Sequence, residues 1–137
     1  MKNWIRILTI LSVLGIIISA FLTYSYYNPN TSGLCNISET ISCEKISTSK
    51  YAVFFGVPVA ILGIFFFLIS LLLVTNLNKN PNSTAYLLTW NSIGIIFMAY
   101  LILAEFLVKS ICLWCTAIHL IIIADFILMF KLHKKNN

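Results

Sequence analysis

The residues best suited to chemistry are two cysteines in the segment ICLWCTAIH, residues 111–119. Cys112 and Cys115 form a C-x-x-C pair, and a disulfide between them would close almost no loop, so it would stabilise a fold far less than a long-range bridge. Such pairs usually serve redox chemistry, because a thiol at a helix N-terminus meets the positive end of the helix dipole and ionises more readily. The segment therefore predicts a reactive dithiol beside a hydrophobic stretch.

Helical spacing connects this dithiol to a histidine. At about 100° per residue, Cys112, Cys115 and His119 fall within a sector of about 60°, so we expect them on one helix face. In a membrane helix an ionisable side chain is a functional candidate, and His119 could donate a hydrogen bond to a ligand carbonyl or only to a neighbouring helix. Trp114 could stack on a cofactor or anchor the helix at the membrane interface.

The elements that must position these residues are membrane helices. Of the 137 residues, 60% are hydrophobic and only 9% are charged, against about 25% charged residues in an ordinary soluble domain. A span needs about 20 apolar residues, and four largely uncharged runs supply that length, the last of them by continuing past Asp125. The expected spans are residues 7–27, 54–76, 84–105 and 111–131. A cleaved signal peptide is the alternative for the first run, but that run is longer than the apolar region of a typical signal peptide.

Basic residues predict the orientation of the chain. Four spans put both termini on one side, which then carries six basic residues: Lys2, Arg6, Lys79, Lys131, Lys134 and Lys135. The other side carries three: Lys45, Lys50 and Lys109. By the positive-inside rule, we expect cytoplasmic termini in a multi-pass protein of the cell membrane, with the loop of residues 28–50 outside. The net charge of +5 is thus mostly a topology signal, and no interleaving of basic and aromatic residues indicates nucleic-acid binding.

A long outer connection, residues 28–50, follows the first span, and the two later connections are short, so consecutive helices are expected to be antiparallel neighbours. We therefore expect an all-α, up-down four-helix bundle forming a single domain over residues 1–137. Small residues such as Gly15, Ser19 and Gly63 could allow close helix approach in lipid. Asp125 is rotated about 80° from Cys115 and is not expected in the same site, and Glu105 is expected at the membrane interface.

A second cysteine pair, Cys35 and Cys43, lies in the outer loop segment CNISETISC. All four cysteines then meet the oxidising compartment, which favours disulfide chemistry. Two structural disulfides are one alternative, and a four-thiolate zinc centre is another. Because seven residues separate the loop cysteines and the outer side is oxidising, we expect no metal.

These segments together resemble the vitamin K epoxide reductase family in its bacterial or archaeal form. The resemblance rests on CNISETISCEKISTS, then FFGVPVAILG, then CLWCTAIH, in the family's order from about Leu34 to His119. It implies four helices around a quinone, ubiquinone or menaquinone, capped by the outer loop. The disulfide bond formation protein B type shares this chemistry, but there the C-x-x-C precedes the loop pair, whereas here it follows.

The resemblance also implies roles for individual residues. Cys35 and Cys43 would be the loop pair, Cys112 would exchange with Cys43, and Cys115 would be the thiolate facing the quinone. Ser49 matches the family's loop serine. Many prokaryotic relatives carry a fused thioredoxin-like domain after an extra helix, whereas this chain stops at Asn137, so we expect a separate thioredoxin-fold redox partner.

Two departures from the family pattern bear on the substrate. Val59 stands where animal members have a quinone-binding asparagine, and His119 replaces a tyrosine four residues after the second active-site cysteine. Both weigh against reduction of vitamin K epoxide. The expected function is therefore a membrane thiol–quinone oxidoreductase that reoxidises its partner and drives disulfide formation. The alternatives are a vitamin K quinone or epoxide reductase and a non-catalytic membrane protein with structural or metal-binding cysteines.

Overall fold

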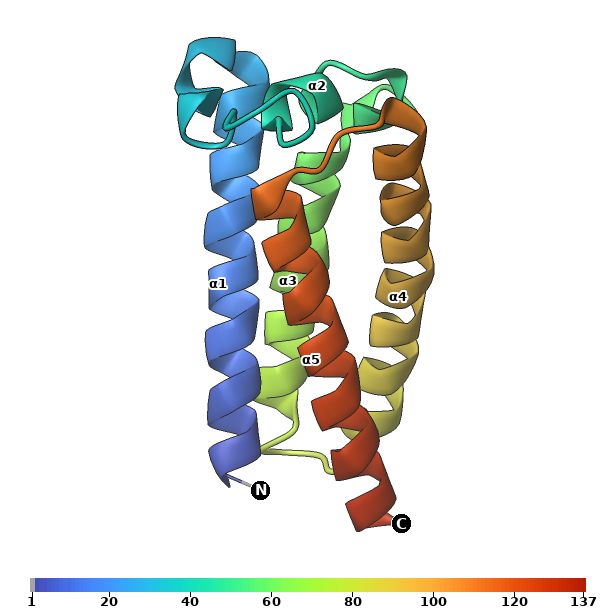
Figure 1. The fold of residues 1–137 in the computed structure, drawn as a ribbon. Coiled ribbons are helices and arrows are strands. Elements are labelled where there is room, and N and C mark those ends of the chain that lie inside the picture. The colour runs from blue at the N-terminus through green and yellow to red at the C-terminus, as the bar shows by residue number, and fades with distance from the viewer. Residues whose placement is uncertain (1) are drawn as a thin grey trace.

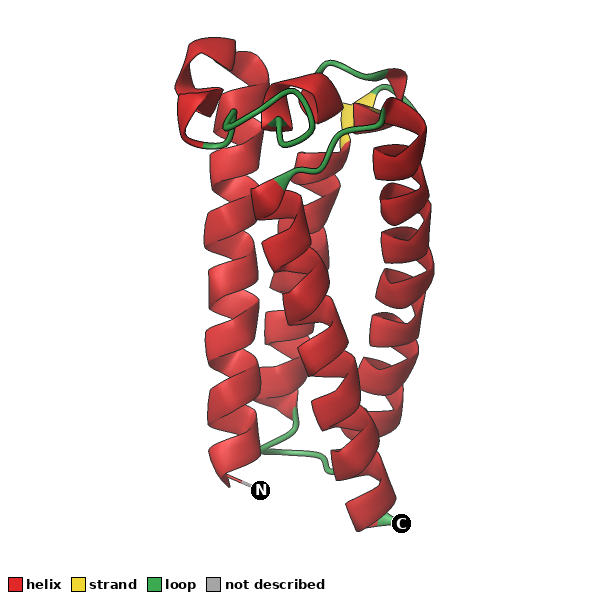
Figure 2. Cartoon of the chain, viewed as in Figure 1, coloured by secondary structure: helices red, strands yellow, loops and turns green. Residues whose placement is uncertain are grey.

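The computed structural model describes residues 2–137, without the side chains of Ser32 and Leu34. Four long helices run side by side, as Figures 1 and 2 show: α1 (Lys2–Tyr27), α3 (Val59–Asn76), α4 (Ser83–Val108) and α5 (Leu113–Asn136). All four are long and apolar enough to cross a membrane. Each also exposes large apolar side chains that lipid would cover, among them Ile17, Leu72, Ile96 and Leu120. The expected four-helix membrane bundle is confirmed.

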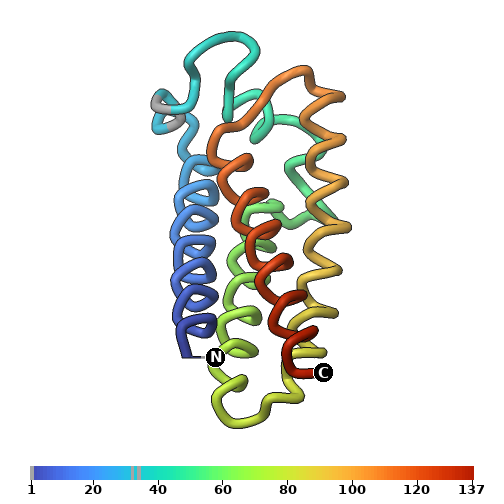
Figure 3. Tube along the Cα trace, turned by 60° about the horizontal axis from the view of Figure 1, so that its bottom comes forward, coloured from blue at the N-terminus to red at the C-terminus, as the bar shows by residue number. Residues whose placement is uncertain are grey.

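Both termini lie at one end of the bundle, and the first long loop covers the other end (Figures 1 and 3). This cysteine loop, residues 28–58, contains η1 (Pro29–Leu34), α2 (Cys43–Ser47), η2 (Lys50–Ala52) and a small hairpin of β1 (Val53–Phe54) and β2 (Val57–Pro58). Ser42 caps α2 by accepting a hydrogen bond from the Lys45 N–H at 3.3 Å. The cysteine loop is thus a structured segment that covers this end of the bundle.

The start of the second long helix differs from the sequence prediction. The span was expected from residue 54, but α3 begins at Val59, because residues 53–58 form an antiparallel hairpin that pairs Val53 with Pro58. Phe55 and Gly56 form its turn with positive φ angles of 52° and 79°. An apolar run alone does not separate a hairpin from the first turn of a helix.

Helix α1 packs on α3 and α5, while α4 packs on α5 and α3. Gly15 lies directly against the ring of Phe67, and Gly63 lies against Ser19, so small residues bring α1 and α3 close together, as expected. Near the termini the helices close on an apolar core that includes Leu8, Leu77 and Met129. Toward the cysteine loop, the bundle instead surrounds a cavity.

Candidate active site

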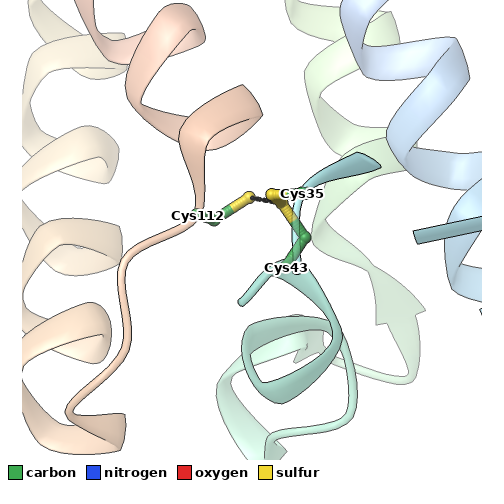
Figure 4. Close-up of side chains that lie close together, drawn as sticks. All are labelled: Cys35, Cys43 and Cys112. Atoms are coloured by element: carbon green, nitrogen blue, oxygen red, sulfur yellow. Dashed lines mark hydrogen bonds between the residues drawn. A yellow bond between two sulfur atoms is a disulfide. The ribbon is translucent and has the colours of Figure 1, made fainter. Parts of the chain in front are cut away.

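Three cysteine sulfur atoms lie close together, two from the cysteine loop and one from Cys112 (Figure 4). Cys35 and Cys43 form a disulfide, and the Sγ atom of Cys112 lies 2.9 Å from that of Cys43. All three side chains are buried, and their sulfur atoms lie within 4.8 Å of one another. The loop disulfide and the start of α5 are therefore close enough for thiol–disulfide exchange. In this redox state the sulfurs of Cys35 and Cys43 are engaged with each other and offer no thiolate to a metal.

Backbone pairing holds the two cysteine-bearing segments together. Ile41 and Ile111 form a parallel bridge, in which the Ile111 N–H donates to the Thr40 carbonyl at 2.7 Å and the Ser42 N–H donates to the Ile111 carbonyl at 3.1 Å. The buried hydroxyl of Ser110 lies 3.2 Å from the carbonyl oxygens of both Thr40 and Ser42. We call residues 40–42 and 110–111 the clasp. Because a cysteine directly follows each segment, the clasp sets Cys43 beside Cys112.

Cys112 lies just outside α5, which corrects the prediction from helical spacing. It is the N-cap residue with an extended backbone (φ −96°, ψ 117°), and its Sγ accepts a hydrogen bond from the Cys115 N–H at 3.3 Å. The regular spacing of about 100° therefore holds only from Leu113 onward. Cys112 faces the cysteine loop, whereas Cys115 and His119 line the cavity within the bundle.

The cap geometry favours a thiolate on Cys112. The pKa of Cys112 is lowered, first by a hydrogen bond from the Cys115 thiol and further by the N–H groups of Cys115 and Trp114, although burial opposes this. The sequence resemblance gave the thiolate role to Cys115. In the redox state of this structure, Cys112 is the better thiolate and Cys115 is its donor.

The cavity has a volume of about 350 Å³ and lies among all four long helices, under α2 and η2. Its walls are mainly apolar, with side chains such as Leu22, Ala60 and Ile118. Val59, the predicted cofactor-binding residue of the second span, is one of the residues that line it. His119 also lines it, and its Nε2 atom is buried with no hydrogen-bond partner among the described residues. This polar atom is available to a ligand.

Two other predicted site residues lie elsewhere. The ring of Trp114 packs against Phe21, 5.3 Å between centroids, beside the loop disulfide and outside the main cavity. The expectation that Trp114 stacks on a cofactor is therefore not supported by its position, because the first turn of α5 directs it toward α1. Ser49 does not line the cavity either, and its hydroxyl donates to the Ile46 carbonyl at 2.7 Å. Ser49 thus shapes the loop that covers the cavity.

Sequence reasoning missed Glu105 as a site residue. It was expected at the membrane interface, but it lines the cavity, with Oε1 buried and without a hydrogen-bond partner among the described residues. The available signal was an acidic residue at the end of a long apolar run, since ionisable groups in membrane helices often mark functional sites. The clasp gave no comparable signal, because backbone pairing between distant segments leaves no short motif.

The cavity fits the quinone expected from the sequence resemblance. A volume of about 350 Å³ falls in the usual range of small-molecule sites, and apolar walls suit a flat, lipid-soluble ring. The unpartnered polar atoms of His119 and Glu105 are the kind of groups that would orient its carbonyl oxygens. Cys115 lines the same space, so a thiol would face the ring.

Comparison with known proteins agrees with this arrangement. The model of the vitamin K epoxide reductase family matches residues 6–130, nearly the whole chain. Among curated proteins, none matches the chain. We conclude from the family match, the four membrane helices and the cysteine arrangement that the chain belongs to the vitamin K epoxide reductase family and is a membrane oxidoreductase of that type.

Proposed function

We propose that the protein is a thiol–quinone oxidoreductase that oxidises a separate thioredoxin-fold partner and so drives disulfide formation outside the cytoplasm. One observation carries the proposal: Cys112 contacts the loop disulfide at 2.9 Å, while Cys115, three residues later, lines an apolar cavity. The two ends of the C-x-x-C pair thus meet the two reactants of such an enzyme. One is the loop cysteine pair, which supplies the electrons when it is reduced, and the other is a lipid-soluble ring, which accepts them.

The protein steps are two successive thiolate attacks. When the loop pair is reduced and Cys112–Cys115 is a disulfide, the Cys43 thiolate attacks Cys112, and Cys115 leaves as a thiolate. The Cys35 thiolate then attacks Cys43 and releases Cys112. The loop pair becomes a disulfide and the C-x-x-C pair a dithiol, so two electrons and two protons have moved inward. The structure corresponds to the redox state after these steps.

The environment of Cys112 supports this direction. In the second attack Cys112 is the leaving group, and thiol–disulfide exchange is faster when the leaving thiol has a lower pKa. The pKa of Cys112 is lowered by the hydrogen bond from the Cys115 thiol. The same contact therefore helps release Cys112 and leaves Cys115 as a thiol at the cavity.

A bound quinone would supply the oxidising power, taking two electrons and two protons from the C-x-x-C dithiol as its disulfide re-forms. The protein's own contribution is to hold Cys115 at the cavity wall, to offer the polar atoms of His119 and Glu105, and to exclude water with apolar side chains. Val59 supplies an apolar wall where a polar ligand contact is expected in animal members. We propose ubiquinone or menaquinone as the quinone.

The partner must reach the loop disulfide, which is buried when the clasp is closed. Cys35 and Cys43 are each only 2% exposed. A partner thiolate can therefore attack their disulfide only after the cysteine loop has moved away from Ile111. We propose that the loop alternates between this docked form and an open form that faces outside. The distribution of basic residues supports cytoplasmic termini, which would put the loop on the outer side.

The test is quinone reduction by the purified protein, followed by absorbance, with a reduced thioredoxin-fold protein as electron donor. We expect turnover in the wild type and its loss in Cys112→Ala and Cys115→Ala variants that still fold. Unchanged turnover in these variants would reject the proposal. The same assay with vitamin K epoxide as the acceptor separates a thiol–quinone oxidoreductase from an epoxide reductase. Bound zinc without quinone reduction would favour a metal-binding role.

A further inference from the structure

The cavity contains a carboxyl group that the exchange chemistry does not use. Glu105 lies near the end of α4 and reaches the same cavity as Cys115 and His119, which come from α5. Its Oε1 atom is buried and has no hydrogen-bond partner among the described residues. A buried polar atom without a partner is costly, so its retention in an apolar cavity points to a ligand.

The surroundings favour a protonated carboxyl. None of the described residues that line the cavity is Lys or Arg, so no cation there compensates a carboxylate. A charged group in an apolar membrane site is far more costly than its neutral form. A neutral carboxyl has one O–H donor, whereas a carboxylate can only accept. The oxygens of a quinone are acceptors, so only the neutral form complements them.

We propose that Glu105, as a neutral carboxylic acid, donates a hydrogen bond to one carbonyl oxygen of the quinone, and that His119 of α5 donates a hydrogen bond to the other. This inference rests on the proposed function, because it assumes a quinone in the cavity. Two polar groups from different helices would fix a ring that apolar walls alone would leave free to turn. Glu105 is then a binding residue specific to a ligand with carbonyl groups.

Quinone affinity tests the inference without turnover. Trp90 lines the cavity, so quenching of tryptophan fluorescence by a short-chain ubiquinone, and in a second series by a short-chain menaquinone, reports binding. Loss of one hydrogen bond in Glu105→Ala should weaken affinity about five- to tenfold, whereas Glu105→Gln keeps an N–H donor and should stay within about twofold of the wild type. The matched control is Asp125→Asn, because Asp125 is a buried carboxyl outside the cavity.

The outcomes are distinct. If the wild type binds neither quinone, the proposed function fails. If the wild type binds but Glu105→Ala binds equally well, or Glu105→Gln binds as weakly as Glu105→Ala, the inference about Glu105 fails and the proposed function stands.

A second measurement uses only the wild type, in case the variants do not fold. Dicyclohexylcarbodiimide, which modifies protonated carboxyls in apolar sites, should label Glu105, and bound quinone should slow this labelling. Mass spectrometry that finds no label, or labelling unaffected by quinone, would overturn the inference.

Discussion

The Sγ atoms of Cys43 and Cys112 lie 2.9 Å apart, although 69 positions separate the two residues in the chain. One belongs to the start of α2 in the cysteine loop and the other caps α5. The clasp holds both segments by backbone hydrogen bonds, so the contact depends on the docked loop. Much of the protein's chemistry follows from this single pairing.

The first prediction concerns this pairing directly. In a Cys35→Ser/Cys115→Ser double variant only Cys43 and Cys112 remain, and mild oxidation should join them nearly completely. The Cys43→Ser/Cys112→Ser variant is the matched control, because Cys115 faces the cavity instead of the loop. Mass spectrometry of non-reduced peptides measures both products. Equal yields in the two variants would mean that the loop does not dock as described.

The acidity of Cys112 gives a second prediction. In a Cys115→Ser variant the hydroxyl still donates to the Cys112 sulfur, whereas in Cys115→Ala this hydrogen bond is lost, so the pKa of Cys112 should be higher in the alanine variant. At a pH between the two values, more thiolate should be present in the serine variant. Ultraviolet absorbance of the thiolate during a pH titration measures this, since only Cys112 titrates as a thiol while the loop disulfide is intact. Coinciding titrations would contradict the role of Cys115 as donor.

Ser110 should control opening of the clasp. The Ser110→Ala change removes a buried hydroxyl that donates to the loop carbonyls, which should cost about 1 kcal/mol and increase the open population about fivefold. Hydrogen exchange at the Ile111 and Ser42 amides should accelerate accordingly. Ser92→Ala is the control, because the Ser92 hydroxyl bonds only within α4, to the Leu88 carbonyl. If Ser110→Ala accelerated exchange at these two amides no more than Ser92→Ala does, the Ser110 hydroxyl would not hold the clasp closed.

The close approach of α1 and α3 gives a stability prediction. A Cβ atom at Gly15 would lie 2.5 Å from the Phe67 ring, so Gly15→Ala should destabilise the bundle by about 1–3 kcal/mol through overpacking. Gly33→Ala is the control, since a Cβ there would meet nothing within 4 Å. Thermal unfolding in detergent measures both. A Gly15→Ala variant as stable as the control would show that the helices can separate without cost.

Much of the architecture could be predicted from the sequence, because the formation of a membrane helix depends on the residues of a single segment. A span needs only a long enough apolar run, so four largely uncharged segments sufficed to predict four membrane helices. The segments CNISETISCEKISTS, FFGVPVAILG and CLWCTAIH, in this order, predicted the family, which the family match confirms. The hairpin at residues 53–58 escaped prediction, because an apolar stretch does not reveal where its helix starts.

Only the tertiary structure decided how the site is divided. The sequence placed Cys112, Cys115 and His119 on one helix face, yet the capping geometry turns Cys112 toward the loop and leaves Cys115 and His119 at the cavity. Glu105 and the clasp likewise join segments whose proximity depends on how helices pack and loops dock. Local sequence sets which residues a helix contains, whereas the side chains that meet across a bundle are set by packing over the whole chain.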